Sequence, residues 1–452
     1  MVGNLLNLGI NIPHNHFGHG GKFLAISIPV LTLSGTFLVP LLMQKWYGID
    51  DLELFLNTRQ KSGLKRFFRR YYNMVTSLKA SWFGRKILRY KPEYGGRVKE
   101  LIIYPIKSIS QGLHVKSWEI SAHSVKYDRQ YALVMRNPKL PDQWVVQNHL
   151  QQTKLGIVRI EFIRNEQSEE LDGTFVFTYP LKHESGPDFV GKSFSLPAKV
   201  TPEYLRSVTG TDEENLPIRI WLKDMMTIDI TAALPKDFAE ELELPAETRL
   251  VYSLSGKSVD ANAPPKLEDT AKRMTLFQDY YPALMITKED VDDLQQKIRN
   301  AGSDFQISSS SFRANIVLED TPRAFDTDMW YLFNIIHTDP ETKEETKRLW
   351  RGSLKCMRCN IPNVSLKTGE LDPKSVPTKL MSRYRRVDEG VPFISCFGIY
   401  VTQYDSGYTI TAGDRVEIVQ RKSQFVDDNP FVLPKGQKKK PGDWDLGDIP
   451  QN

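Results

Sequence analysis

The chain has 452 residues, of which 40% are hydrophobic and 25% are charged, so it can form two or three domains with buried cores. Its formal net charge is +5, but residues 45–91 carry twelve Lys or Arg against three Asp or Glu, which leaves the rest of the chain slightly acidic. A basic nucleic-acid-binding surface on the globular part is therefore excluded. Three cysteines are too few for a disulfide framework and suit a reducing compartment.

An uncharged apolar segment over residues 23–43 follows a leader of residues 1–22. As a helix its 21 residues would reach about 31 Å, close to the roughly 30 Å thickness of a membrane's hydrocarbon core. A cleaved secretory signal is disfavoured because the segment is long and the leader contains only one Lys or Arg, and a buried core helix is the other alternative. We predict a transmembrane helix over residues 23–43.

A basic juxtamembrane linker, residues 44–95, comes next. Because twelve cationic side chains lie just after the apolar segment and one lies before it, the positive-inside rule predicts a single-pass protein with a cytosolic globular part. KRFFRRYY (65–72) mixes cations with aromatic rings, which is typical of a segment that lies on anionic lipid headgroups. A solvated basic linker is an equal alternative.

Short apolar segments separated by turn residues make the body of the chain β-rich. RVKELIIYPI (97–106) predicts the strand that opens the first domain. Further strands are predicted, up to about residue 230, in YALVM, WVV, LGIVRIEFI, TFVFTYP and IRIWL. A boundary near residues 235–245 separates this N-terminal domain, 96–235, from a second domain, 245–422.

The second domain contains the clearest helix signal, in residues 289–302. Thr287 can cap the N-terminus of this helix with Asp290 three residues further on, and Gly302 can end it. The helix and the surrounding strands predict an α+β fold class.

Two later segments of the second domain, SFRANIVLED (311–320) and DRVEIVQR (414–421), return to a strand pattern. The Pro-, Gly- and Lys-rich tail that follows, residues 423–452, is predicted to be disordered.

KCMRC (355–359) holds two of the three cysteines, Cys356 and Cys359. A four-ligand zinc site is disfavoured because the one other cysteine is Cys396 and no suitable pair of histidines lies nearby. A thioredoxin-type dithiol needs a helix after the motif, whereas NIPNVSLKTG predicts a loop, and the cytosolic orientation disfavours a disulfide. Two structural cysteines on a strand, or one thiolate that Arg358 favours and that binds a metal, remain.

Two cations, Lys107 in YPIKS (104–108) and Arg129 in YDRQY (127–131), follow predicted strands. Arg offers a bidentate fork and Lys a point charge, so the two could bind one anion together. The alternative is that both are solvated at the ends of their strands.

The order of these motifs resembles that of the MOSC domain family over roughly residues 96–422. Within that family the chain is similar to the mitochondrial amidoxime-reducing component type, which are membrane-anchored molybdenum enzymes. The motifs that carry the resemblance, in chain order, are YPIKS, the DR of YDRQY, FRANIV (312–317), C-x-R-C ending at Cys359, TG (368–369), P…L…YRR (377–386) and FGIY (397–400).

The resemblance implies a fold and a cofactor. The fold is a β-barrel-like MOSC N-terminal domain over residues 96–235, followed by a mixed β-barrel and helix MOSC domain over residues 245–422. The cofactor is the molybdenum cofactor, a pyranopterin dithiolene with a terminal phosphate. Pyridoxal phosphate is not expected, because the large domain that uses it in molybdenum-cofactor sulfurases is missing here.

The resemblance also implies roles for individual residues. Cys359 would be the thiolate ligand of molybdenum and the catalytic residue, and Cys356 a bystander. Asn315 would orient its segment. The residues that match cofactor-binding positions of the family are Lys107, Ser108, Arg129, Arg313, Asn315, Arg358 and Tyr400.

The chain departs from the family pattern at four places. VVQNHLQ (145–151) lacks an expected Arg, and DYYP (279–282) places Tyr280 where the family has a small hydroxyl residue. Ala314 replaces a proline, and Ser365 replaces an aspartate. Because the thiolate and four cations remain, the resemblance predicts that cofactor binding is kept and that substrate preference differs.

Three functions follow from these observations. The first, which the resemblance implies, is a molybdenum oxidoreductase that reduces small N-hydroxylated substrates such as amidoximes and hydroxylamines. Its electrons would come from a b-type cytochrome and its NADH-linked reductase, since the chain lacks a nucleotide-binding motif. The second is a carrier module for the cofactor or for sulfur, and the third is a catalytically decayed, membrane-tethered binding protein. The expected partners also include membrane lipid, and the favoured location is the mitochondrial outer membrane rather than the endoplasmic reticulum.

Overall fold

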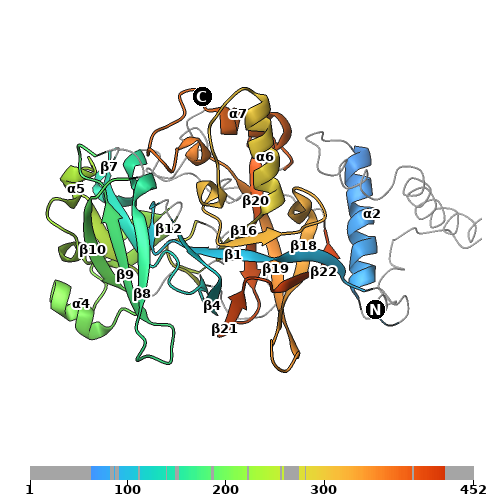
Figure 1. Ribbon diagram of the computed structural model, residues 1–452, viewed down its shortest axis with the longest axis horizontal. Helices are drawn as coiled ribbons and strands as arrows, with labels where there is room; N and C mark the ends of the chain where they lie inside the picture. The colour runs from blue at the N-terminus through green and yellow to red at the C-terminus, as the bar shows by residue number, and fades with distance from the viewer. Residues whose placement is uncertain are drawn as a thin grey trace, which may run out of the picture. The chain divides into compact units, whose positions relative to one another are not determined.

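The computed structural model describes residues 63–81, 86, 91–109, 112–138, 140–147, 152–184, 188–220, 223–254, 257–258, 274–279, 281–388 and 391–422 (Figure 1). The chain divides into two compact units, Met1–Leu56 and Asn57–Asn452, and the described residues all belong to the second. The predicted leader, transmembrane helix and disordered tail lie outside the described residues. Among the helices that are described, none is long and apolar enough to cross a membrane.

The larger sheet closes into a barrel of seven strands, because its first and seventh strands, β17 and β1, also pair with each other. This confirms the β-rich, barrel-containing fold that the sequence predicts. A further short strand, β3 (Leu113–Val115), extends the sheet beyond β1. The barrel strands, in spatial order, are β17 (Ile316–Glu319), β16 (Ala283–Thr287), β20 (Cys396–Gln403), β19 (Glu345–Met357), β18 (Trp330–Thr338), β22 (Arg415–Arg421) and β1 (Glu93–Ile103).

Alternating side chains fill the barrel. Trp330, Trp350 and Val401 belong to one large buried core cluster, as do Ile399 and Ile418. Because successive side chains of a strand point to opposite faces, the neighbours of these residues lie on the outer face. The outer face of β16, β17 and β20 carries a second buried cluster, which continues into the helices α6 (Lys288–Asn300) and α7 (Val376–Tyr384).

A second sheet has the order β13–β12–β11–β7–β6 and also closes on itself, through pairing of β13 with β6. Its edge strand β2 (Ile106–Lys107) runs parallel to β6. The closed strands are β6 (Tyr131–Asn137), β7 (Leu140–Val146), β11 (Leu216–Ile220), β12 (Lys223–Asp229) and β13 (Arg249–Tyr252).

Three smaller sheets and several short helices complete the described chain. The sheets are β8 (Arg159–Arg164) with β9 (Gly173–Tyr179) and β10 (Lys192–Pro197); β4 (Ser117–Ser121) with β5 (Ser124–Val125) and β21 (Tyr408–Thr411); and β14 (Lys257–Ser258) with β15 (Met274–Thr275). The short helices are α4 (Pro202–Thr209), α5 (Phe238–Glu241), η1 (Thr153–Ile157), η2 (Thr231–Ala233), η4 (Ser309–Phe312), η5 (Asp326–Met329) and η6 (Ile361–Asn363).

The predicted helix over residues 289–302 is confirmed as α6, with its predicted cap. The hydroxyl of Thr287 accepts a hydrogen bond from the main-chain N–H of Asp290 at 3.0 Å, and the carboxylate of Asp290 accepts one from the N–H of Thr287 at 3.1 Å. Gly302, with φ of 75°, lies just beyond the helix, where a left-handed residue is favoured. Figure 1 shows α6 beside α7, and the two helices are in contact.

The segment predicted as a lipid-facing or solvated linker differs in the structure. Residues 63–80 form a helix, α2 (Gly63–Ala80), which packs against β22 (Figure 1). Phe68, Tyr71 and Tyr72 are buried rather than free to contact headgroups. The spacing of these aromatic residues at i, i+3 and i+4 is that of one helix face.

The strand pairings do not follow the expected order of two successive domains. Strand β1, predicted to open the N-terminal domain, pairs with β17 and β22 and so completes the C-terminal barrel. Strand β13 lies after the predicted boundary at 235–245 but pairs with β12 and β6. Alternation along a strand shows that a strand forms but does not show its partner, which is set by contacts distant in sequence.

Two predicted strands begin later in the structure than expected. The start of LGIVRIEFI is the 3-10 helix η1, and β8 begins only at Arg159. The start of SFRANIVLED belongs to η4, and β17 begins at Ile316. Both segments have apolar runs too short to separate helix from strand by periodicity.

Candidate functional site

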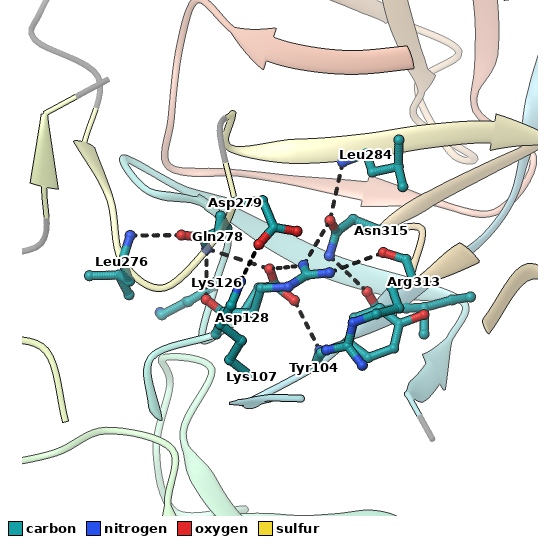
Figure 2. A network of polar contacts seen from close by, with 12 residues as sticks. Tyr104, Lys107, Lys126, Asp128, Leu276, Gln278, Asp279, Leu284, Arg313 and Asn315 are labelled. Atoms are coloured by element: carbon teal, nitrogen blue, oxygen red, sulfur yellow. Dashed lines mark hydrogen bonds and ion pairs between the residues drawn. The ribbon is translucent and has the colours of Figure 1, made fainter. Parts of the chain in front are cut away.

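Asp128 connects the YPIKS and YDRQY segments. Its Oδ1 accepts a hydrogen bond from the main-chain N–H of Tyr104 at 3.0 Å, and its Oδ2 accepts one from Nη1 of Arg129 at 2.5 Å (Figure 2). The side-chain amide of Gln278 donates to its main-chain carbonyl at 2.8 Å. Asp128 is 1% exposed, so these bonds replace water around a buried carboxylate.

Arg129 and Arg313 are held around one aromatic ring. Their guanidinium carbons lie 4.9 and 4.7 Å from the centroid of the Tyr104 ring. Nη2 of Arg129 also donates to the main-chain carbonyl of Arg313 at 3.0 Å. The structure thus brings together two cations that are far apart in the sequence.

Hydrogen bonds of the Asn315 side chain connect these cations to the barrel. Its Oδ1 accepts hydrogen bonds from Nη1 of Arg129 at 3.1 Å and from the N–H of Leu284 at 3.2 Å, and its Nδ2 donates to the carbonyl of Ile102 at 3.2 Å (Figure 2). The residue is 1% exposed. Asn315 therefore fixes the position of the Arg129 guanidinium relative to β1 and β16.

Lys107 and Ser108 lie at the end of β2. The Lys107 ammonium forms an ion pair with Asp279, a residue that the sequence analysis did not single out (Figure 2). Burial lowers the pKa of Lys107, and the Asp279 charge opposes this. The Ser108 hydroxyl donates to the main-chain carbonyl of Gln147, whose own side-chain amide is fully buried and has no hydrogen-bond partner within the described ranges.

Three of the candidate residues have left-handed backbones: φ is 79° at Ser108, 51° at Arg129 and 57° at Arg313. Residues with side chains adopt this conformation only at a cost of about 1–3 kcal/mol each, and such residues cluster at binding sites. Three of the ten described non-glycine residues with such backbones therefore lie where the resemblance places the cofactor.

Arg313 has no carboxylate partner among the residues that the structure describes. Its Nη1 donates to the carbonyl of Ile109 at 2.7 Å, but its Nη2 is buried without an acceptor. Burial, together with the positive charge of Arg129, lowers the pKa of Arg313 to about 10. A buried cation without a counter-ion is costly, so the site favours an anionic ligand.

Arg358 is a second guanidinium without a carboxylate partner in the described part of the chain, and it is partly buried. Its Nη1 donates to Sγ of Cys356 at 3.1 Å and its Nη2 to the carbonyl of Phe312 at 3.1 Å, while its Nε has no acceptor. Arg358 therefore orients Cys356 directly, and through Phe312 it connects the cysteine motif to Arg313.

Cys359 follows the end of β19 and is half-buried, and neither it nor Cys356 forms a disulfide. Burial raises the pKa of the Cys359 thiol, and the charge of Arg358 and the N–H of Ile361 only partly oppose this. The charge of Arg358 therefore acts in the predicted direction, towards the thiolate. Binding of a cation to the sulfur would remove the proton.

Tyr400, on β20, lies against Tyr281, with ring centroids 5.8 Å apart. Burial raises the pKa of Tyr400 well above its usual value, and the charges of Cys356 and Asp279 add to this. Tyr281, in the segment where the family pattern differs, thus occupies space beside a candidate cofactor-binding residue. Tyr280 lies outside the described residues.

Asp279 links the two halves of the site. Its charge acts on Cys359 and Tyr400 on one side and on Arg129 and Arg313 on the other, besides its ion pair with Lys107. The cation group and the cysteine group therefore both lie within electrostatic range of one carboxylate, and the hydrogen bond from Arg358 to the carbonyl of Phe312 connects them.

The residues present fit an anionic cofactor with a metal that accepts one thiolate. Among the described residues, the buried Arg313 and the partly buried Arg358 pair with no carboxylate, the buried amide of Gln147 has no hydrogen-bond partner, and one half-buried thiol lies nearby. No cluster of three or more His, Cys, Asp or Glu that could hold a metal ion occurs in the described part of the chain.

Sequence reasoning missed Asp128, Asp279 and Gln147. Asp128 directly precedes Arg129, which the sequence predicts to bind an anion. A buried arginine needs a counter-ion, and this need was the signal that could have identified Asp128. Gln147 lies in VVQNHLQ, where an Arg was expected, and residues 148–151 lie outside the described residues.

The structure describes two further positions at which the chain departs from the family pattern. Ala314 is fully buried in the outer cluster. The Ser365 hydroxyl accepts from the N–H groups of Lys367 and Thr368 and so stabilises the turn before TG.

Comparison with known proteins agrees with this geometry. The chain is 22% identical over 310 residues to a molybdenum cofactor sulfurase of Bombyx mori; the match covers 68% of this chain and 32% of that protein. The chain thus spans about a third of the length of this curated relative. A model of the MOSC domain matches residues 272–417, which include Arg313, Asn315, Arg358, Cys359 and Tyr400. The resemblance predicted from the motifs is therefore confirmed: the chain contains a MOSC domain over residues 272–417.

Proposed function

We propose that the chain binds a molybdenum cofactor and acts as an oxidoreductase on N-hydroxylated substrates, with amidoximes and hydroxylamines as the substrate class. The observation that carries the proposal is a pair of guanidinium groups, the buried Arg313 and the partly buried Arg358, that lack carboxylate partners in the described residues beside the half-buried thiol of Cys359. A polyanionic cofactor would supply both missing counter-charges, and its metal would accept the sulfur.

Each part of the site has a binding role in this proposal. Arg313, Arg129 and Lys107 hold the cofactor's phosphate and pterin, while Ser108 fixes the end of β2. Arg358 and Tyr400 bind the side of the cofactor nearest the thiol. Asn315 positions Arg129, and Cys359 provides the sulfur that anchors the metal.

When bound, the cofactor supplies two-electron oxygen-atom transfer, so that the N–O bond breaks and, with two protons, water leaves. The chain must deliver those protons. Asp279 is suited to this, because its side chain is 39% exposed and its charge reaches both Tyr400 and Cys359. Lys107 keeps that carboxylate oriented towards the site.

The electron donor and the location belong to the same proposal. The sequence lacks a nucleotide-binding motif, so we propose a b-type cytochrome with an NADH-linked reductase as the donor. An anchor over residues 23–43 in the mitochondrial outer membrane, with the globular part in the cytosol, would keep the enzyme near membrane-held donors. Pyridoxal phosphate has no role in the proposal.

The test is turnover by the full chain, purified from a host that makes the molybdenum cofactor. After chemical reduction, the protein should convert an amidoxime to the amidine, and Cys359→Ser should abolish the conversion. Reduced b-type cytochrome should replace the chemical reductant. Bound molybdenum without any turnover would contradict the reductase assignment.

A second candidate, a carrier module for the cofactor or for sulfur, is favoured by one observation. The curated relative is named for sulfuration of the molybdenum cofactor, and the match covers about two thirds of this chain. A carrier would bind the cofactor and release it to an acceptor protein without reducing N-hydroxylated compounds. A protein that binds no molybdenum at all would instead support the third candidate, a membrane-tethered binder whose site has been altered around Tyr281.

A further inference from the structure

Arg351 is a buried cation outside the candidate cofactor site. It lies on β19, and its side chain points away from the barrel interior, because its neighbour Trp350 belongs to the barrel core. Arg351 is only 4% exposed, yet its Nε and Nη2 have no hydrogen-bond acceptor among the described residues. Burial of these N–H groups without a partner is costly.

A second cation converges on the same place. The guanidinium carbon of Arg351 lies 5.0 Å, and Nζ of Lys422 lies 4.6 Å, from the centroid of the Tyr331 ring. Lys422 is fixed at the end of β22 by a hydrogen bond from its main-chain N–H to the carbonyl of Met329 at 2.7 Å. Burial and the charge of Arg351 lower the pKa of Lys422.

The acidic residues Asp326 and Glu93, at this end of the barrel, pair with Arg421. Nη1 and Nη2 of Arg421 donate to the two carboxylate oxygens of Asp326 at 3.0 and 2.9 Å, and Nε of Arg421 donates to the carboxylate of Glu93 at 2.8 Å. Neither Arg351 nor Lys422 has an ion pair with a carboxylate in the part of the chain that the structure describes. Thr402, directly across from Arg351 on β20, shares a hydroxyl contact of 3.1 Å with Ser353 and adds no negative charge.

We propose that Arg351 and Lys422 form a second oxyanion site, on the outer face of the barrel, that binds a phosphate group against the ring of Tyr331. The planar guanidinium offers two free N–H donors to two phosphate oxygens, and the ammonium supplies a point charge. This site shares no residue with the candidate cofactor site and does not depend on the proposed function. The phosphate can belong to a soluble ester or to a lipid headgroup.

The test is calorimetric titration of the full chain, in detergent, with inorganic phosphate. Because the cofactor site also carries free cations, each site is removed in turn, by Arg351→Gln and by Arg313→Gln. We expect Arg351→Gln to lose one class of phosphate binding, with affinity reduced roughly ten- to hundredfold, as for loss of a charge-assisted hydrogen bond. Arg313→Gln should leave that class intact.

Two further variants control for charge and folding. Arg348→Gln removes a cation from the same strand, one whose guanidinium carbon lies 4.9 Å from the Tyr408 ring, and should bind phosphate as the wild type does. Arg351→Lys keeps the charge but not the fork and should have intermediate affinity. Thermal unfolding checks that each variant is folded.

Vesicles of phosphatidylcholine, with and without phosphatidic acid, separate the two sources of phosphate. Because the proposed anchor would bind both kinds of vesicle, the readout is the additional binding that phosphatidic acid produces. An increase in the wild type that is smaller in Arg351→Gln would assign a lipid headgroup. Binding of free phosphate alone would assign a soluble ester. If Arg351→Gln binds both probes as tightly as the wild type, the proposal is wrong.

Discussion

Arg129 donates a hydrogen bond from Nη2 to the main-chain carbonyl of Arg313, 3.0 Å away, across 184 residues of sequence. This contact keeps two buried cations side by side in the protein without a ligand. Of the two, Arg129 forms an ion pair with Asp128, whereas Arg313 forms no ion pair among the described residues. The two guanidinium groups therefore repel each other in the folded protein, and an anionic ligand would reduce this repulsion.

Replacement of Arg313 should weaken cofactor binding while it changes the stability of the protein little. Arg313→Gln removes an uncompensated charge, so the free energy of unfolding of the cofactor-free protein should change by less than about 1 kcal/mol. Cofactor content should fall at least about tenfold, as for loss of a charged hydrogen-bond donor. Chemical denaturation and metal analysis measure the two effects.

The matched control for Arg313 is Arg385. It is also buried, but its Nη2 lies 2.9 Å from both carboxylate oxygens of Asp328. Arg385→Gln leaves that carboxylate buried and unpaired, which should cost about 3–5 kcal/mol of stability. Equal destabilisation by the two substitutions would show that Arg313 has a counter-ion and would remove the argument for an anionic ligand.

Asn315→Ala should destabilise the protein and disturb the site together. The substitution leaves a buried N–H of Leu284, a buried carbonyl of Ile102 and one N–H of Arg129 unsatisfied. We expect a loss of about 2–4 kcal/mol in the free energy of unfolding, measured by denaturant titration. Asn300→Ala at the exposed end of α6 should cost less than about 0.5 kcal/mol, and similar losses at the two positions would contradict this account of Asn315.

Stability should depend on pH through Asp290. This carboxyl is fully buried at the start of α6, and burial raises its pKa from 3.8 to about 7, although the N–H groups of Thr287 and Phe325 donate to it. Between these pH values the folded state keeps a proton that the unfolded state has lost. The contribution of Asp290 to the free energy of unfolding is therefore greatest below pH 3.8 and falls as pH rises to about 7, by about 1.4 kcal/mol per pH unit.

Asp290→Asn isolates this effect, because it removes the ionisable group. The single side-chain oxygen of asparagine can accept only one of the two N–H donors, which lowers stability by an amount that does not vary with pH. From pH 4 to pH 7 the free energy of unfolding of the wild type should fall relative to that of the variant. Above about pH 7 the difference between the two should stay constant. Denaturant titrations at several pH values measure it. A difference that does not vary with pH would mean that Asp290 is ionised in the folded protein throughout this range.

Local signals in the sequence predicted part of this structure well. The capping box of α6 depends on two residues three positions apart, and it formed as predicted. The glycine of FGIY, in contrast, is required by a neighbouring strand that is distant in sequence. Gly398 has φ of 76°, and a Cβ there would lie 2.8 Å from the carbonyl oxygen of Met285, so the position requires glycine.

Features that depend on distant contacts could not be predicted in the same way. Nothing in the alternation of β1 shows that it pairs with β17 and β22 rather than with strands of its own half. The helix α2 was missed because its aromatic residues were interpreted as facing lipid, whereas they pack on the protein. The counter-ion Asp279 was missed because the 172 residues between it and Lys107 hide the pairing.

The most direct test of the central claim is the molybdenum content of three full-length proteins from a host that makes the cofactor: wild type, Cys359→Ser and Cys356→Ser. The account predicts near-stoichiometric molybdenum in the wild type and its loss in Cys359→Ser, since a hydroxyl is a poor replacement for a soft thiolate. Cys356→Ser should keep most of the metal, because a serine oxygen can also accept the hydrogen bond from Arg358. Loss of molybdenum from both variants alike, or its absence from the wild type, would contradict a site built on the single thiolate of Cys359.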